Sequence, residues 1–494
     1  MIKIFSACLG LLMALPIVAQ DKSQQLEKFV NQTLEEIDII PGLSVAVVMD
    51  AGIVFTKGFG LSNLETGEKA TEKTNFYIAS STKAFNGLLA TELAAEGRLD
   101  LNRDISTYKP FSEFENREVF EGVSVQDLLS HTSGIDNPYL SFLLAYSGDY
   151  TDERILKVTE QFTEKNENGK AFEYTNFGYY MFALLLKYEL GEDWRELLDQ
   201  KLFTPCQMDR ATAYVSESEN RAAPHIGLFP GKVEVAKFKT DKTMHAAGGL
   251  LLNAEDAGNF LSLYLNDGKL RDAQIFEDNV ILESYAPKAD QNDDEKREFT
   301  RIKYGNGWNI GTYNDDKVVF HFGGYTGFAS HISFMPEQKI GVAVFVNHEI
   351  GMPVANMIAE YAYDLYNDNS TELARHEKML KKKLPSMLEG IQKGQIKHEE
   401  KMAARQWQLK FPKESYPGTY RNENFGTVKV WLEDEEFWVA CGNMETVATA
   451  FPEDNCMRVE LVPRSGTIIQ FLSEDGDLNK INWRGEIFTR IKIE

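Results

Sequence analysis

Strand-like patterns stand near both ends of the first two thirds of the chain. Residues 41–60 hold two β-rich runs around Asp50-Ala51-Gly52, which is a hairpin signal. Residues 318–347 again alternate as strands, separated by Gly and Pro turns. The stretch from about 105 to 310 mixes helical patterns and loops. This order predicts an α+β domain whose first and last strands share one antiparallel sheet, flanked by helices and a helical subdomain.

Two helices are predicted next to these strands. From Thr82 to Glu96 the apolar residues recur at helical spacing, and Gly97 marks the end of the helix. A second helix is expected from about Pro353 to Tyr366.

The pattern changes beyond Asn367. Residues 371–405 are rich in lysine and favour helix, with Pro385, Gly390 and Gly394 predicted to break the run. We interpret this segment as an exposed connector; a basic membrane-binding helix is the alternative. Short alternating strands with turns follow, so a small all-β, barrel-like domain is expected at the end of the chain.

These patterns predict four segments in a chain of 494 residues. The first is a secretory signal peptide, because Lys3 precedes an apolar stretch from Ile4 to Val18 and a small Ala19. The sequence therefore predicts an exported, periplasmic or secreted protein without an integral membrane segment after cleavage. The expected boundaries are 1–19 for the signal peptide, 20–368 for the α+β domain, 369–412 for the helical connector and 413–494 for the β domain.

Charge and composition exclude several classes of function. The net charge of -23 argues against nucleic acid as a partner. The histidines are scattered and no CxxC or HExxH occurs, so neither a metal nor another cofactor is expected. Cys206 is expected to be a small buried residue, and Cys441 and Cys456 either pair in a disulfide or stay reduced.

The candidate chemistry begins at IASSTKAF, residues 78–85. Residues i and i+3 share a helix face, so Ser80 and Lys83 are expected to meet, whereas Ser81 would meet Ala84. A serine hydroxyl becomes a useful nucleophile when a neighbouring base takes its proton, and a lysine with a lowered pKa can do so. Alternatively, Ser80 caps the helix and Lys83 is solvated.

Two further motifs favour the catalytic interpretation of Ser80 and Lys83 over the capping one. AFEYTNFGY supplies Tyr174 and Asn176 in Y-x-N spacing, and HFGGYTGF supplies His321 and Gly323 in H-x-G spacing. With S-x-x-K, in this order, they resemble the serine β-lactamase and penicillin-binding protein superfamily, in the branch of class C β-lactamases, D-alanyl-D-alanine carboxypeptidases and esterases. The stretches LLSHTSGI, AAGGLLLNAEDAGNFL and YGNGW agree with it, and the resemblance covers about residues 25–366.

The resemblance implies a role for each matching position. Ser80 would be acylated, Lys83 would assist its deprotonation, and Tyr174 would act as general base in the phenolate form. The substrate-binding positions would be Asn176, which also bonds Lys83, His321 on the opposite wall, Gly323 of the H-x-G motif, and Gly324, whose N–H forms the oxyanion hole with that of Ser80. His131 in LLSHTSGI is expected to orient a loop.

The resemblance implies an acyl-enzyme hydrolase that cleaves an ester, an amide or a D-amino-acid peptide. The family's K-T-G motif is replaced here by His321, Phe322 and Gly323, so weak binding of a substrate carboxylate and at most slow β-lactamase activity are expected. The partner would be a small molecule or a peptide. A non-catalytic protein that binds β-lactams or cell-wall fragments on the same fold is the alternative.

Overall fold

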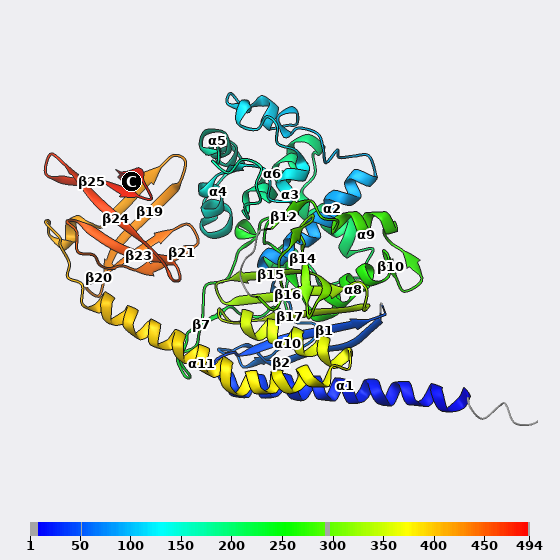
Figure 1. Cartoon of the computed structure of the whole chain (residues 1–494). Coiled ribbons are helices and arrows are strands. Elements are labelled where there is room, and N and C mark those ends of the chain that lie inside the picture. Colours follow the sequence, from blue (N-terminus) through cyan, green and yellow to red (C-terminus); the bar gives the residue numbers. More distant parts are fainter. Residues whose placement is uncertain (1–7, 51, 292–296, 493–494) are drawn as a thin grey trace, which may run out of the picture.

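The computed structural model describes residues 8–50, 52–291 and 297–492, in which a nine-stranded antiparallel sheet forms the centre of the larger part (Figure 1). The two ends of this part meet in the sheet, because its last strand pairs with its first. In spatial order the strands are β12 (Ala289–Asp290), β13 (Lys303–Tyr304), β14 (Asn309–Tyr313), β15 (Asp316–Tyr325), β16 (Phe328–Met335), β17 (Ile340–Val346), β1 (Gly42–Met49), β2 (Gly52–Asn63) and β3 (Glu68–Lys69). The predicted α+β arrangement and the hairpin of β1 and β2 are confirmed; Ala51 in its turn lies outside the described residues.

Helices cover both faces of this sheet because its central strands are apolar on both sides. In β1, Val45 and Val47 belong to one buried cluster, whereas Ala46 and Val48 belong to the other. The first cluster contains α1 (Cys8–Ile37) and α10 (Met352–Tyr366), and the second contains α2 (Thr82–Ala95) and α8 (Ala254–Leu265). The helices predicted after Ser81 and near Pro353 are thus present.

The helical subdomain lies on the α2 side of the sheet (Figure 1). Its helices are α3 (Val125–Leu129), α4 (Pro138–Phe142), α5 (Asp152–Phe162), α6 (Phe177–Leu185) and α7 (Trp194–Leu198), with α9 (Asp278–Ser284) against α2. A π-helical turn, η5 (Leu143–Ser147), follows α4.

The connector differs from the prediction because it is one continuous helix, α11 (Ser370–Ala403), which contains Pro385. Its side chains His376, Leu380, Leu384 and Leu388 are buried with α10 and α1. This packing stabilises helical backbone that the local sequence disfavours. The apolar face is therefore covered by protein, which argues against the membrane-binding alternative.

A small polar cluster is buried between α10 and α11. His376 Nε2 lies 2.7 Å from Asp364 Oδ2, and the Tyr313 hydroxyl donates to the same oxygen at 2.6 Å. Glu360 lies beside them, with its Oε2 3.8 Å from His376 Nδ1. Burial raises the pKa of Glu360 to about 8.

The C-terminal part is a second nine-stranded antiparallel sheet that curls into a nearly closed barrel, with β21 beside β23 (Figure 1). Its strands, in spatial order, are β21 (Met444–Val447), β20 (Glu436–Cys441), β19 (Gly426–Glu433), β18 (Gly418–Asn422), β26 (Glu486–Ile491), β25 (Asp477–Trp483), β24 (Ser465–Glu474), β23 (Cys456–Val462) and β22 (Thr449–Ala450). The predicted β domain is confirmed. Cys206, Cys441 and Cys456 are buried free thiols, so the disulfide alternative is wrong.

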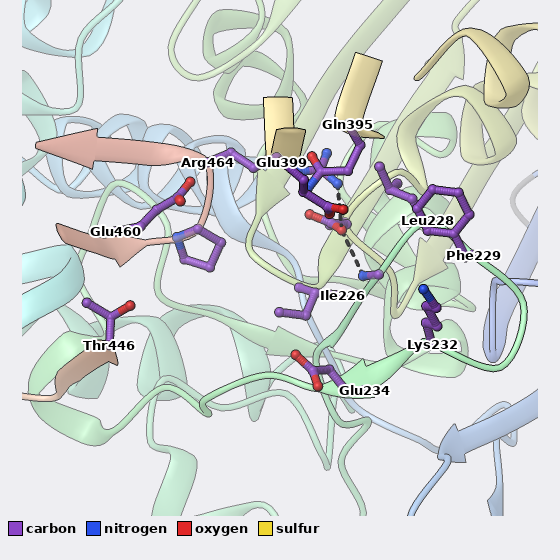
Figure 2. A pocket seen from close by; sticks show the side chains of 13 residues that line it. Ile226, Leu228, Phe229, Lys232, Glu234, Gln395, Glu399, Thr446, Glu460 and Arg464 are labelled. Atoms are coloured by element: carbon purple, nitrogen blue, oxygen red, sulfur yellow. Dashed lines mark hydrogen bonds and ion pairs between the residues drawn. The ribbon is translucent and has the colours of Figure 1, made fainter. Parts of the chain in front are cut away.

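A hollow of about 390 Å³ lies where the larger part, α11 and the C-terminal sheet meet (Figure 2). The hairpin of β7 (His225–Ile226) and β8 (Glu234–Val235) forms one side of it. Glu349 accepts hydrogen bonds from Gly227 N and from Arg464 of the C-terminal sheet, both at 2.9 Å. None of the predicted site residues lines this hollow.

Candidate active site

Ser80 lies in a tight 3₁₀ turn, Ala79–Ser81, immediately before α2. Ala79 has a left-handed φ of 45°, which is uncommon for a residue with a side chain. The Ser80 side chain remains partly exposed. Ser81 is fully buried, and its hydroxyl donates to the His321 carbonyl at 3.1 Å. The structure thus separates the two neighbouring serines into one accessible and one internal hydroxyl.

Lys83 is fully buried, and its Nζ contacts three oxygen atoms. Ser80 Oγ lies at 3.1 Å, Asn176 Oδ1 at 2.7 Å and the Ala247 carbonyl at 2.8 Å. The alternative of a solvated Lys83 and a capping Ser80 is therefore wrong; the turn shows no side-chain cap.

The surroundings of Lys83 favour a neutral amine. Burial lowers the pKa of Lys83 well below its usual value, and no ion pair to Lys83 is found within the described ranges. A neutral amine has two N–H donors and one lone pair. The amide oxygen of Asn176 and the Ala247 carbonyl can only accept, so they take both donors. In the neutral form the lone pair is then left for the Ser80 hydroxyl, whereas a charged Nζ donates to Ser80 Oγ.

Tyr174 and Asn176 lie on the loop that leads into α6. Lys83 Nζ is 4.9 Å from the centroid of the Tyr174 ring. Although 45% of Tyr174 is exposed, desolvation by the surrounding protein raises the pKa of its hydroxyl to about 12, while the nearby Ser80 hydroxyl and the Arg301 charge lower it in part. This shift favours the neutral phenol in the free protein and does not support the expected phenolate, so the role of Tyr174 as general base stays a prediction.

A chain of hydrogen bonds runs behind Tyr174 and ends at His321. Thr175 N donates to His131 Nδ1 at 3.4 Å, and His131 Nε2 lies 3.2 Å from the Tyr304 hydroxyl. The same hydroxyl lies 3.1 Å from His321 Nε2. The His131 carbonyl also accepts from Glu173 N at 2.9 Å, so His131 orients the loop that carries Tyr174, as expected.

His321 is buried and neutral. Burial, the charge of Lys83 and that of Arg301 lower its pKa to about 3, although the bond to the Phe322 carbonyl raises it in part. His321 Nδ1 lies 2.8 Å from that carbonyl, and Nε2 faces Tyr304. Both ring nitrogens are thus engaged, and the ring carries no charge with which to hold a substrate carboxylate.

The two glycines after Phe322 occupy different surroundings. A Cβ on Gly323 would lie 2.0 Å from the Ile78 carbonyl, so this position lets β15 approach the turn that carries Ser80. Gly324 is exposed, and a Cβ there would meet no atom within 4 Å. The side of Gly324 on which a Cβ would stand is therefore open, whereas the corresponding side of Gly323 is filled.

Three residues that hold the site in place were given no role in the sequence analysis. The Ala247 carbonyl and the hydroxyls of Tyr304 and Ser330 each hold one of the predicted residues or the turn beside it. Tyr304 and Ala247 stand in the quoted stretches YGNGW and AAGGLLLNAEDAGNFL. Ser330 has no comparable signal, because a serine within an apolar strand is common.

No group of three or more His, Cys, Asp or Glu side chains in the described part of the chain is arranged to hold a metal ion. Among the same residues, no helix is both long and apolar enough to cross a membrane.

Comparison with known proteins agrees with the geometry. The family model described as Beta-lactamase matches residues 30–366, which is more than half of the chain. The chain belongs to the β-lactamase family. Within the curated members, Protein flp of Staphylococcus aureus (strain N315) is 25% identical over 363 residues, which cover 73% of this chain and 68% of that protein.

Solved structures share the fold of this β-lactamase family member. The octameric penicillin-binding protein homologue from Pyrococcus abyssi aligns with a TM-score of 0.59 and 21% identity, over 94% of this chain and 99% of that one. The D-amino acid amidase from Ochrobactrum anthropi SV3 aligns with a TM-score of 0.56 and 19% identity, over 69% of this chain and 99% of that one. The first alignment includes the C-terminal sheet, and the fold of both parts is therefore shared.

Proposed function

We propose that the protein is a serine hydrolase that forms an acyl-enzyme on Ser80 and cleaves an ester, an amide or a D-amino-acid peptide. The observation that carries this proposal is the placement of a buried Lys83, whose pKa is lowered by burial, with its Nζ 3.1 Å from Oγ of a partly exposed Ser80. Two carbonyl-type acceptors fix its N–H groups. A lysine that served only packing would not need this orientation toward a hydroxyl.

The proposed proton path uses Lys83 and Tyr174 in different steps. The Lys83 lone pair takes the Ser80 proton while Oγ attacks the substrate carbonyl. The N–H groups of Ser80 and Gly324 stabilise the negative oxygen that develops. The neutral Tyr174 hydroxyl, beside Ser80, donates a proton to the leaving group, and the Lys83 ammonium then restores the phenol.

Neutral substrates are favoured because His321 and Phe322, which replace the Lys and Thr of the family's K-T-G motif, supply no positive charge to hold a substrate carboxylate. His321 is uncharged and internally bonded, and Phe322 packs against Phe320 and His331 with ring centroids 4.7 Å away. A missing hydrogen bond to a charged group costs about 1.5–3 kcal/mol. We therefore propose at most slow turnover of β-lactams, whose carboxylate needs such a clamp.

The relative named D-amino acid amidase supports an amide or D-amino-acid substrate, since it shares the fold over 69% of this chain. We also propose export of the protein with cleavage after Ala19, supported by the apolar stretch that follows Lys3. N-terminal sequencing of the protein from the periplasm or the medium would then begin at Gln20; an unprocessed Met1 in the cytoplasmic fraction alone would refute export.

Mass spectrometry of the intact protein tests the proposed activity. The protein is mixed with p-nitrophenyl esters, D-amino-acid amides and penicillins, and the adduct is mapped by peptide analysis. We expect a transient acyl adduct on Ser80 that disappears as product forms. If none of the three substrate classes gives an adduct that turns over, the result would instead support the non-catalytic binding protein.

A further inference from the structure

A second buried lysine, Lys239, lies among three tyrosines outside the catalytic residues. Its Nζ is 3.8 Å from the ring centroid of Tyr325, 5.2 Å from that of Tyr77 and 5.6 Å from that of Tyr146. It also donates to the Ala145 carbonyl of η5 and, at 3.3 Å, to the Thr243 carbonyl. We call Lys239, Tyr77, Tyr146 and Tyr325 the lysine–tyrosine cluster.

This cluster adjoins the candidate active site through two of its members. Tyr325 directly follows Gly324, and Tyr77 directly precedes Ile78, whose carbonyl faces Gly323. The Tyr77 and Tyr325 rings meet edge to face at 5.3 Å, and Tyr146 stacks on Tyr325 at 5.6 Å. The position of the Gly324 backbone therefore depends on how η5 and Lys239 hold Tyr325.

The C-terminal sheet contacts both segments that support the cluster. In the turn between β20 and β21, Asn443 N donates to the Ser147 carbonyl at the end of η5, at 2.6 Å. The Asn443 side chain donates through Nδ2 to the carbonyl of Phe238, the residue before Lys239, at 3.2 Å. One residue of the C-terminal sheet thus joins the segment that bears Tyr146 to the segment that bears Lys239.

The neighbouring glycine makes this approach possible. A Cβ on Gly442 would lie 2.1 Å from the Ser147 carbonyl oxygen, and its φ of 55° is also left-handed. Asp149, two residues beyond Ser147, accepts from Thr427 N of β19 at 3.0 Å. The end of η5 is therefore held by two parts of the C-terminal sheet, the turn between β20 and β21 and the start of β19.

We propose that Asn443 is a positioning residue for the active site: the C-terminal sheet sets, through Asn443, the wall of Tyr146 and Tyr325 beside Gly324. The inference rests on the proposed function, because the wall would decide which acyl group fits next to the oxyanion position. A bulky acyl group reaches this wall, whereas an acetyl group is too small to depend on it.

The test compares Asn443→Ala and Gly442→Ala with Gly476→Ala. Gly476 lies in another turn of the same sheet with a φ of 87°, and a Cβ there meets nothing within 4 Å, so this control carries similar backbone strain without the contact. Rates are normalised to the fraction of protein that a fluorophosphonate labels at Ser80. Loss of folded protein alone then leaves the normalised rates unchanged.

For a p-nitrophenyl ester with a bulky aromatic acyl group, we expect kcat/KM to fall about tenfold in both test variants, mainly through KM, as loss of a positioning bond implies. For p-nitrophenyl acetate we expect less than a twofold change, and Gly476→Ala should match the wild type on both esters. Normalised values within twofold of wild type for both esters and both test variants would overturn the inference.

Hydrogen exchange followed by mass spectrometry supplies a readout that needs no substrate. Peptides covering residues 143–149 and 322–328 should exchange faster in Asn443→Ala than in Gly476→Ala, and unchanged exchange would overturn the role of Asn443. A wild-type protein that takes no acyl group at Ser80 would refute the proposed function instead, and the exchange result would still decide the positioning role.

Discussion

The Ser81 hydroxyl lies 2.8 Å from the Ser330 hydroxyl, inside the protein. This pairing assigns the neighbouring serines to different tasks. Ser80→Ala should therefore lose all fluorophosphonate labelling, whereas Ser81→Ala should keep labelling at Ser80 with lower thermal stability. Peptide mapping of the adduct checks both variants; a labelled Ser80→Ala protein would exclude Ser80 as the nucleophile.

Lys83 and Tyr174 should act as a unit, because the proton that Lys83 takes from Ser80 later replaces the one that Tyr174 gives to the leaving group. Lys83→Ala and Tyr174→Phe should each lower kcat by roughly 10²–10⁴-fold. The double variant should lose little more than the worse single variant, since coupled catalytic groups are strongly non-additive. Steady-state kinetics on one ester decides this, and a double loss equal to the product of the single losses would contradict a shared network.

The pH dependence follows from the directions of the pKa shifts. Lys83 must be neutral to accept a proton, so kcat/KM should rise as pH increases through its lowered pKa and then stay level. Tyr174 must stay protonated, and its pKa of about 12 puts the falling limb above pH 9. An ester assay from pH 5 to 9 should therefore show no fall on the alkaline side; a fall centred below pH 9 would contradict the roles assigned here.

The pH profile of kcat/KM should show no inflection near pH 6.5 from His321, because the pKa of this histidine is lowered to about 3. His321→Asn should keep the shape of the wild-type pH profile even where its rate is lower. A wild-type inflection near pH 6.5 that is lost in His321→Asn would show that the ring becomes charged during turnover.

Neutral esters should be better substrates than β-lactams. We expect kcat/KM for nitrocefin to lie at least about a hundredfold below that for a p-nitrophenyl ester, as two weak carboxylate contacts imply. Arg301, whose charge acts on Tyr174 and His321, is the control position. Fast nitrocefin turnover that Arg301→Gln abolishes would mean that this arginine supplies the clamp.

Glu360 should destabilise the folded protein at neutral pH. Its pKa of about 8 lies above the ordinary 4.5, so the stability that it contributes is complete below pH 4.5 and is lost as pH rises through 8. Glu360→Gln removes this loss and should raise the free energy of unfolding on the order of 3 kcal/mol at pH 7, with little change at pH 4. The exposed Glu400→Gln on α11 is the matched control; equal stabilisation at both pH values would contradict the assignment.

The sequence predicted contacts that depend on short spacings. Ser80 and Lys83 meet because they stand three positions apart at the start of one helix. The distant pairing of β1 with β17 was predicted on other grounds, from the strand patterns at both ends of the domain. The ionisation of Tyr174 depends instead on residues far along the chain that surround its hydroxyl, and no local pattern records them. Continuity of α11 through Pro385 likewise depends on packing against α1 and α10.

Lys239 was outside the prediction for the same reason. Nothing in KFKTDKT distinguishes Lys239 from the two other lysines there, and the three tyrosines around it come from separate segments of the chain. Asn443 is further still from the motifs in sequence. Only the folded chain brings its turn against Ser147 and Phe238.

Because α11 is continuous, it fixes the rotation of the C-terminal sheet about the helix axis. It also fixes the distance of that sheet from the larger part. A helix of 34 residues spans about 50 Å, and each residue turns the chain by about 100°. Adding one residue beyond Leu388 would rotate the whole sheet by that angle and carry Asn443 away from Ser147. Adding seven would nearly restore the angle but lengthen the helix by about 10 Å. Insertions in α11 should therefore be as disruptive to the remote turn as mutation of the turn itself.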